Sequence, residues 1–258
     1  MIHGTFKKNY SIIIITALAV LFALAMTVHQ MSYRYIKLEG GLKYFGKTEN
    51  NYPTVGTVLY PDGNRGKIDT EKGIIEFSDG STYTGGLYGI QRHGSGILTY
   101  SDGSVYTGEF RFDKISGTGV LTVPNGEKYA GNFKNGKKHG EGTYVYSDKS
   151  VYMGSFEEDK KHGHGTLRGA DGSIYEGGFE NNLRSGTGTI TYSNRDSYTG
   201  EFSDDMRNGN GTYIWSQGMK YTGEFSSDKM TGSGRLSFPD GTVIEGIFED
   251  GVLVQEKK

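Results

Sequence analysis

The chain has 258 residues, of which 42 are glycine, 19 tyrosine, 13 phenylalanine and none cysteine, and its formal net charge is −2. Glycine therefore makes up about 16% of the chain, more than double its usual share of about 7%. So much glycine argues against a packed α/β enzyme core, and the aromatic content argues against disorder. The lack of cysteine excludes disulfides and thiolate chemistry, and the balanced charge gives no basic face for nucleic acid.

The amino-terminal part contains one long apolar run. Residues Ile12–Val28 are interrupted only by Thr16 and Thr27. As a helix, this run spans about 26 Å, near the lower limit for crossing a hydrocarbon core of about 30 Å. We therefore interpret residues 12–31 as a single transmembrane anchor that follows a short tail, residues 1–11.

The flanks of this run bear on its cleavage and on the orientation of the chain. An Ala-Leu-Ala tripeptide at residues 23–25 has the small-x-small pattern of a cleavage site, so a cleaved signal peptide is the alternative. Lys7 and Lys8 precede the run, which favours a cytoplasmic amino terminus and an extracytoplasmic remainder. Residues 32–59 are either a juxtamembrane spacer or a cap on the structure that follows.

From Tyr60 onward the sequence repeats with a period of 23 residues. Tyrosine starts each repeat, glycine follows two residues later, and an apolar residue, mostly phenylalanine, follows two residues after that. The tyrosine column is Tyr83, Tyr106, Tyr129, Tyr152, Tyr175, Tyr198 and Tyr221. Seven full repeats run from Tyr83 to Val243 with partial repeats at both ends, as the capping of a stack requires. We place the repeat domain at residues 60–254.

Each repeat contains two alternating stretches joined by a turn. Asp102-Gly103 and Asn125-Gly126 are examples of the turn, and such dipeptides supply the positive φ angles of a tight hairpin. Alternation with period two indicates strands, so one repeat is one β-hairpin. The alternating pairs of the first stretch include Leu121/Val123, Tyr144/Tyr146, Ile190/Tyr192, Tyr213/Trp215 and Leu236/Phe238, whereas Leu167/Gly169 breaks the pattern.

The pattern Tyr-x-Gly-x-Phe followed by His-Gly-x-Gly and a turn, clearest at residues 129–150 and 152–173, resembles the MORN (membrane occupation and recognition nexus) repeat. The resemblance extends over residues 60–250. It implies an all-β fold, namely an elongated single-layer antiparallel sheet of stacked hairpins with a grooved cross-section. It also implies scaffolding, self-association, protein binding and sometimes phospholipid binding. Enzymes of this family carry a separate catalytic domain, for which this chain has no room, so we expect no enzymatic activity.

Two columns of residues are candidates for binding. The tyrosine rings are either core or, if they line the concave face, a surface that docks a partner protein. These tyrosines are Tyr106, Tyr129, Tyr152, Tyr175, Tyr198 and Tyr221. The basic loop residues form either a solvated edge or a stripe that binds anionic phospholipid or envelope polymer. These basic residues are Lys137, Lys138, Lys160, Lys161, Arg184 and Arg207.

Other chemistry is not supported by the spacing. His139 and His162 are equivalent positions one repeat apart, hence roughly 9–10 Å apart, which is too far for two ligands of one metal ion. Acidic groups such as Glu157-Glu158-Asp159 and Asp204-Asp205 fall in loops and are expected to be solvated. We predict no metal, no cofactor and no nucleic-acid partner.

Together these observations predict a non-enzymatic, membrane-anchored scaffold. It would bind and position partner proteins at the membrane or cell envelope, and it could form a homodimer through the ends of the repeat ribbon. A module that binds anionic phospholipid or envelope polymer through its basic edge is the alternative.

Overall fold

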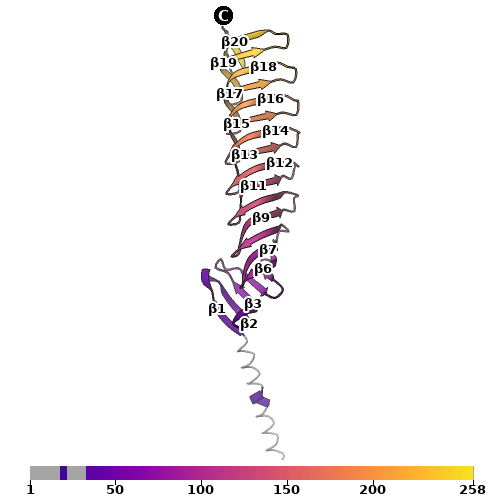
Figure 1. Ribbon diagram of the computed structural model, residues 1–258, viewed down its shortest axis with the longest axis vertical. Coiled ribbons are helices and arrows are strands. Elements are labelled where there is room, and N and C mark those ends of the chain that lie inside the picture. Colours follow the sequence, from indigo (N-terminus) through magenta and orange to yellow (C-terminus); the bar gives the residue numbers. More distant parts are fainter. Residues whose placement is uncertain (1–17, 22–32, 258) are drawn as a thin grey trace, which may run out of the picture. The chain divides into compact units, whose positions relative to one another are not determined.

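The computed structural model describes residues 18–21 and 33–257, and the chain divides into two compact units, Met1–Ser101 and Asp102–Lys258. The described residues form 21 strands, one short 3-10 helix and a helical turn at residues 18–21 (Figure 1). Within each unit, every strand pairs antiparallel with its neighbour along the chain. The predicted all-β, antiparallel class is confirmed.

The first unit is a meander of seven strands. They are β1 Tyr33–Lys37, β2 Lys43–Glu49, β3 Tyr52–Leu59, β4 Arg65–Asp69, β5 Ile74–Phe77, β6 Thr82–Tyr88 and β7 Gln91–Thr99, with the 3-10 helix η1 Glu39–Gly41 between β1 and β2. The β2–β3 hairpin shares features with the repeats. Its Tyr44 is buried and donates a hydrogen bond to the carbonyl oxygen of Lys47, while Gly46 lies opposite Gly56. Strands therefore occupy the segment that the sequence left open as spacer or cap.

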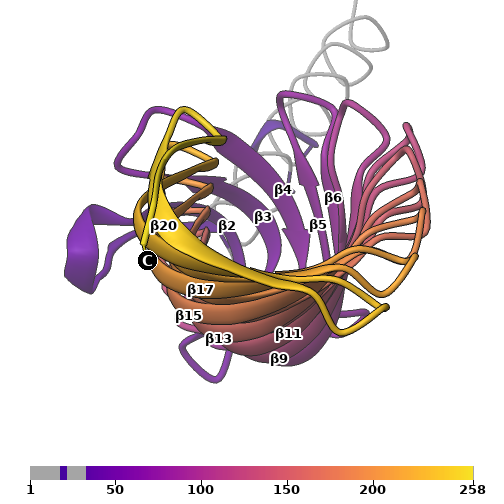
Figure 2. The same ribbon diagram turned by 90° about the horizontal axis from the view of Figure 1, so that it is seen from above.

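The second unit contains fourteen strands. They are β8 Val105–Arg111, β9 Lys114–Thr122, β10 Lys128–Lys134, β11 Lys137–Val145, β12 Val151–Glu157, β13 Lys160–Arg168, β14 Ile174–Glu180, β15 Leu183–Thr191, β16 Ser197–Ser203, β17 Met206–Ile214, β18 Lys220–Ser226, β19 Lys229–Ser237, β20 Val243–Glu249 and β21 Val252–Glu256. Two strands and two turns make one repeat, so the predicted stacked hairpins are confirmed. Figure 2 shows that the strands of this unit, coloured magenta to yellow, form a curved sheet, and we call its concave side the trough.

Two kinds of turn alternate along the second unit. One is the Asp-Gly or Asn-Gly turn expected from the sequence, in which Asn125 Oδ1 accepts a hydrogen bond from the Glu127 N–H at 3.0 Å. The other has two residues with positive φ, for example 48° at Glu158 and 71° at Asp159. Positive φ at both positions defines a type I′ turn, whose twist matches that of the flanking strands. The acidic groups that were expected to be merely solvated thus form the second set of hairpin turns.

Glycine faces glycine across neighbouring strands of the second unit. Gly154 pairs with Gly142 on one side and with Gly165 on the other. The ring of Tyr152 lies against this row, because a Cβ on Gly165 would lie 2.5 Å from Cε2 of that ring. The missing side chain lets the tyrosine fold down onto the backbone, which explains why the glycine column has no exceptions in the seven repeats.

The predicted membrane anchor, residues 12–31, lies outside the described residues apart from residues 18–21. None of the helices that the structure describes is long and apolar enough to span a membrane.

Replacing Gly165 by alanine should destabilise the second unit. The new Cβ would overlap the Tyr152 ring, and overpacking of this kind costs about 1–3 kcal/mol. Thermal unfolding followed by circular dichroism measures the effect. Thr166→Ala, one residue further along β13, is the matched control and should cost less than about 1 kcal/mol. Equal losses in the two variants would contradict the role assigned to the glycine row.

Candidate functional site

The tyrosine column and the phenylalanines four residues later form the core of the second unit. The Tyr152 ring contacts Phe156 of its own repeat and Phe179 of the next, with centroids 5.1 and 5.0 Å apart and interplanar angles of 90° and 84°. The same edge-to-face contacts continue from Tyr106 to Phe248. Such pairs add about 0.5–1.5 kcal/mol each beyond burial. We call this continuous stack the ring ladder.

The ring ladder is closed to partners. All six tyrosines predicted as a possible docking face are at most 2% exposed. They are Tyr106, Tyr129, Tyr152, Tyr175, Tyr198 and Tyr221. Each hydroxyl also donates to the backbone carbonyl three residues later, as Tyr152 Oη does to Ser155 O at 2.9 Å. The tyrosines are therefore core, and the docking interpretation is wrong for them, because the curved sheet closes around the rings.

Four of the six basic residues predicted as an edge lie over the ring ladder instead. These four, which we call the cation column, are Lys138, Lys161, Arg184 and Arg207. The guanidinium carbon of Arg207 lies 5.7, 5.2 and 5.4 Å from the ring centroids of Tyr198, Tyr213 and Phe225. The other three have comparable ring contacts. Cation–π contacts contribute about 0.5–2 kcal/mol each, so these charges stabilise the core.

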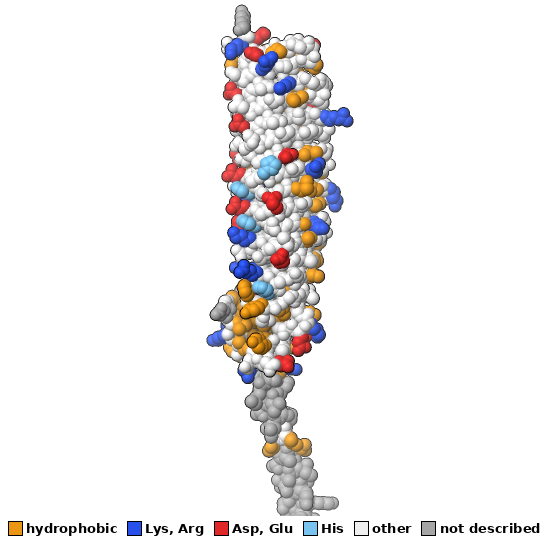
Figure 3. Space-filling model, viewed as in Figure 1, with side chains coloured by type: hydrophobic (Ala, Val, Ile, Leu, Met, Phe, Trp, Pro, Cys, Tyr) orange, Lys and Arg blue, Asp and Glu red, His pale blue; other side chains and the backbone are white. Residues whose placement is uncertain are grey.

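The remaining two basic residues, Lys137 and Lys160, are exposed on the opposite side of the strand from their neighbours, as alternation requires. Lys137 Nζ forms an ion pair with Glu158 at 2.5 Å, and Lys160 Nζ donates to Asn181 Oδ1 at 3.0 Å. Figure 3 shows one face of the molecule, on which Lys and Arg are interspersed with acidic, hydrophobic and histidine side chains. The six residues therefore do not form one continuous basic edge.

The second residue of each short turn binds the preceding repeat. Asp205 Oδ1 accepts hydrogen bonds from the backbone N–H of Arg184 at 2.8 Å and from its Nε at 3.2 Å. The Asp205 N–H donates in return to the Arg184 carbonyl oxygen at 3.2 Å. The same pair of backbone contacts joins Asp159 to Lys138, Asn182 to Lys161 and Asp228 to Arg207. These turns therefore position every member of the cation column.

Half-buried aromatic side chains lie on the same face as the ring ladder, because Tyr144 faces Tyr129 and Tyr213 faces Tyr198 across paired strands. Five of them, which we call the trough rings, are Tyr144, Tyr146, Tyr192, Tyr213 and Trp215. The centroids of Tyr144 and Tyr146 are 4.6 Å apart, and Tyr213 lies 6.0 Å from Tyr192 and 4.7 Å from Trp215. The trough rings thus form two clusters.

Two carboxylates anchor the trough rings. Tyr144 Oη donates to Glu127 Oε2 at 2.6 Å, and Tyr213 Oη donates to Asp196 Oδ2 at 2.7 Å. Burial, reinforced by these carboxylates, raises the pKa of both tyrosines, so both remain protonated donors at neutral pH. Tyr144 and Tyr213, one in each cluster, are therefore held in place by a hydrogen bond to a carboxylate.

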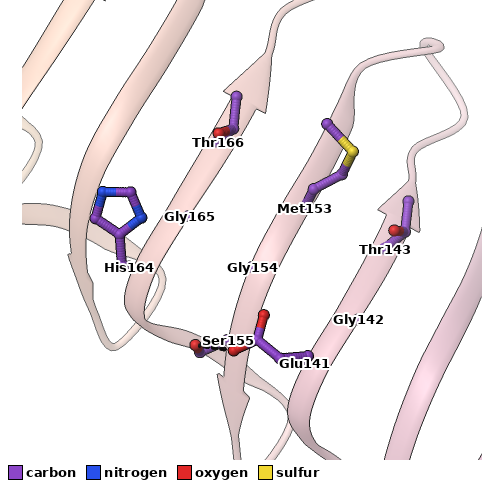
Figure 4. A pocket seen from close by; sticks show the side chains of 9 residues that line it. All are labelled: Glu141, Gly142, Thr143, Met153, Gly154, Ser155, His164, Gly165 and Thr166. Carbon is purple, nitrogen blue, oxygen red and sulfur yellow. Dashed lines mark hydrogen bonds between the residues drawn. The ribbon is translucent and has the colours of Figure 1, made fainter.

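The opposite face carries a shallow hollow of about 530 Å³ over β11, β12 and β13 (Figure 4). Ser155 Oγ donates to Glu141 Oε1 at 2.5 Å, and the His164 ring points away from both. Ser155 and His164 therefore do not form a nucleophile–base pair. Over residues 18–21 and 33–257, no group of three or more His, Asp or Glu side chains is placed to hold a metal ion.

In the sequence, the trough rings are visible only as alternating pairs of aromatic or apolar residues. Tyr144/Tyr146 and Tyr213/Trp215 were recognised as strand faces but not as a site. The signal that would have identified them is their in-register position opposite the tyrosine column. Alternation of side chains along a strand would also have predicted that Lys138 and Lys137 lie on opposite faces of the sheet.

Seven consecutive segments of the chain match the MORN repeat model: residues 83–105, 106–128, 129–151, 152–174, 175–197, 198–220 and 221–243. The chain belongs to the MORN repeat family. The seven full repeats predicted from the 23-residue period have these boundaries, so the second unit described above consists largely of MORN repeats.

No curated protein matches this MORN repeat chain significantly. Among solved structures, it is similar to the TCP10 domain of Danio rerio CPAP in complex with a STIL peptide, with 13% identity and a TM-score of 0.45, covering 88% of this chain and 99% of that one. It is also similar to the Drosophila melanogaster SAS-4 TCP domain in complex with a proline-rich motif of Ana2, with 14% identity and a TM-score of 0.31, covering 84% and 90%. TM-scores below 0.5 support no conclusion about function.

Alkaline pH should unfold the second unit through the ring ladder. Burial raises the pKa of Tyr129, Tyr175, Tyr198 and Tyr221 from 10.0 to about 12. The unfolded chain loses these protons near pH 10 while the folded chain keeps them, so their stabilising contribution is complete below pH 10 and lost between pH 10 and 12.

A pH series followed by circular dichroism and by tyrosinate absorbance measures this. The tyrosinate of the ring ladder should form together with the loss of β-structure. Complete tyrosine ionisation near pH 10 with the sheet intact would contradict the assignment.

Proposed function

We propose that this MORN repeat protein is a non-enzymatic, membrane-anchored scaffold whose trough binds a segment of a partner protein. The observation that carries the proposal is the set of trough rings. Tyrosine and tryptophan dominate the binding energy of many protein interfaces, because they supply a large rigid contact area at low entropic cost. Here they are half-buried and lie over the ring ladder, and two of them, Tyr144 and Tyr213, are bonded to carboxylates, so binding would cost these two side chains little conformational entropy.

The anchor part of the proposal is supported by sequence. The apolar run within residues 12–31 is long enough to hold the chain at a membrane. Lys7 and Lys8 favour an inside location for the tail and an extracytoplasmic location for the repeats. Homodimerisation through the ends of the ribbon remains a prediction.

The alternative function, binding of anionic lipid or polymer through a basic edge, is less well supported. The cation column already contacts aromatic rings, and Lys137 already pairs with Glu158. Binding to a membrane surface would require these charges to leave their partners. We therefore favour the trough over the edge.

Site-specific photocrosslinking tests which face binds. A benzoylphenylalanine in place of Trp215 should give adducts with a partner protein in cells, because this side chain lies in the trough. The same residue in place of Met153, which is 40% exposed on the opposite face, is the matched control and should give none. Adducts from Met153 alone would contradict the proposed face.

Cysteine labelling tests the orientation, since the chain has no native cysteine. A cysteine in place of Ser101, an exposed turn residue, should react with a membrane-impermeant maleimide on intact cells. A cysteine in place of Ser11, in the predicted cytoplasmic tail, is the control and should react only after lysis. The reverse pattern would place the repeats inside the cell.

A further inference from the structure

The first unit exposes large apolar side chains on one face of strands β1–β5. The opposite face of these strands carries the core, in which four side chains are at most 2% exposed: Tyr44, Val58, Ile68 and Ile75. Because side chains alternate along a strand, the residues between them point to the other face. There Tyr35, Phe45 and Val55 are 57%, 59% and 47% exposed. This face therefore presents rings and aliphatic groups that the unit leaves uncovered.

These exposed groups are contiguous. Tyr35 lies directly opposite Phe45 across β1 and β2, and the rings of Tyr33 and Phe45 have centroids 6.1 Å apart. Phe45 and Val55 also border a hollow of about 450 Å³ that continues over β4 and β5 to Ile74. Contiguous apolar surface of this kind marks an interaction site, whereas single exposed apolar residues do not.

Basic side chains surround the apolar groups on the same face. By alternation along the strands they are Lys37, Lys43, Lys47, Arg65 and Lys67. Lys37 lies directly opposite Lys43, and like charges in this arrangement destabilise a sheet. No side chain that the structure describes forms an ion pair with any of these five. We call these five residues, together with Tyr33, Tyr35, Phe45 and Val55, the aromatic–basic face.

Carboxylates do not balance this charge. The acidic residues that alternate onto the same side of the strands are Glu49, Asp69 and Glu76. Asp69 already forms an ion pair with Lys72 at 2.8 Å. The face thus keeps an excess of positive charge, although the formal net charge of the chain is −2. An anionic counterpart would relieve the repulsion between Lys37 and Lys43.

The aromatic–basic face begins close to the predicted membrane anchor. The apolar run ends at Val28 and β1 begins at Tyr33, so five residue-to-residue steps separate them. A fully extended chain covers about 17 Å in five steps, which is the upper limit of this separation. The start of the face is therefore within reach of the headgroups of a bilayer that the run spans.

We propose that the aromatic–basic face lies on the phospholipid bilayer in which the chain is anchored. Tyr33 and Tyr35 occupy the interfacial level, where tyrosine is enriched in membrane proteins, and the basic residues bind headgroup phosphates. This inference rests on the anchor in the proposed function and adds a second membrane contact to it. The contact lies outside the seven matched repeats, residues 83–243, and therefore differs from the basic loop edge considered above.

A second copy of the chain fits this face poorly. In a two-fold dimer the same patch faces itself, so the five basic residues would meet the same five residues of the other copy. A phospholipid surface instead supplies phosphates to the basic residues and hydrocarbon to Phe45 and Val55. One occupant thereby matches both the charge and the apolar part of the face.

Spin labels on single cysteines measure the contact, since the chain has no native cysteine. The full chain is reconstituted into vesicles of phosphatidylcholine with a minority of phosphatidylglycerol. Collisions of the label with oxygen, which concentrates in lipid, are compared with collisions with a water-soluble nickel complex. Labels in Phe45→Cys and Val55→Cys should collide more with oxygen. Ser101→Cys, in an exposed turn of the same unit, is the control and should collide more with the nickel complex.

Neutralising the lysines tests their part in the contact. Lys43→Gln, Lys47→Gln and Lys67→Gln are combined in the chain labelled at residue 55. Loss of three lysines near an anionic surface should shift the equilibrium away from the bilayer on the order of a hundredfold, so this label should then behave like the one at residue 101. The matched control neutralises three exposed lysines of the second unit, Lys114, Lys128 and Lys220, and should leave the label unchanged. Circular dichroism verifies that each variant keeps its fold.

A label in Val20→Cys, within the apolar run, separates this inference from the anchor on which it rests. Oxygen-rich collisions at residue 20 with nickel-rich collisions at residues 45 and 55 would overturn the face and leave the anchor intact. Nickel-rich collisions at residue 20 would overturn both. Few collisions with either reagent at residues 45 and 55 would show that protein covers the face, which also overturns the lipid contact. Equal responses to the two sets of lysine changes would contradict the binding of phosphates by this face.

Discussion

The second unit depends on the contact between a tyrosine ring and a row of glycines. A single-layer sheet has no partner layer against which to bury its side chains, so the sheet must provide a core from one of its own faces. Tyr152 shows how this is achieved, since its ring lies on the backbone at Gly165 and its hydroxyl bonds to Ser155 O at 2.9 Å. Repetition of this contact every 23 residues brings the rings close enough for edge-to-face packing from one repeat to the next.

The position of the ring ladder determines where the other side chains of the same face lie and how far they are buried. Because the tyrosines and phenylalanines occupy the base of the curved face, the next side chains on that face can only lie above them. These are the cation column and the trough rings, which are half-buried rather than exposed. The same face therefore combines a buried hydrophobic base with a half-buried aromatic and charged lining, both supplied by neighbouring residues of one strand.

Much of this fold was predictable from the sequence, because a 23-residue period and alternation with period two are local properties. The seven repeats, their strands and the Asp-Gly turns were found in this way. Curvature is not a local property, and this is why the burial of Tyr152 and its equivalents was left undecided. The acidic turns were missed for a different reason: Glu158-Asp159 lacks glycine, although both residues adopt positive φ. The grooved cross-section was implied by the resemblance to the MORN repeat, but the trough rings were missed as a site because their grouping depends on how neighbouring repeats curve together.

The second residue of each short turn affects the backbone hydrogen bonds and the local charge independently. Asp159, Asn182 and Asp205 hold the preceding repeat through the same backbone hydrogen bonds, so aspartate and asparagine are interchangeable for that purpose. They differ in whether the cation above the core is neutralised. Replacing aspartate by asparagine at one such turn position thus removes a negative charge near the cation column, while every residue that lines the trough stays the same. A tandem array built in this way can change the charge above its core, repeat by repeat, while the core itself stays the same.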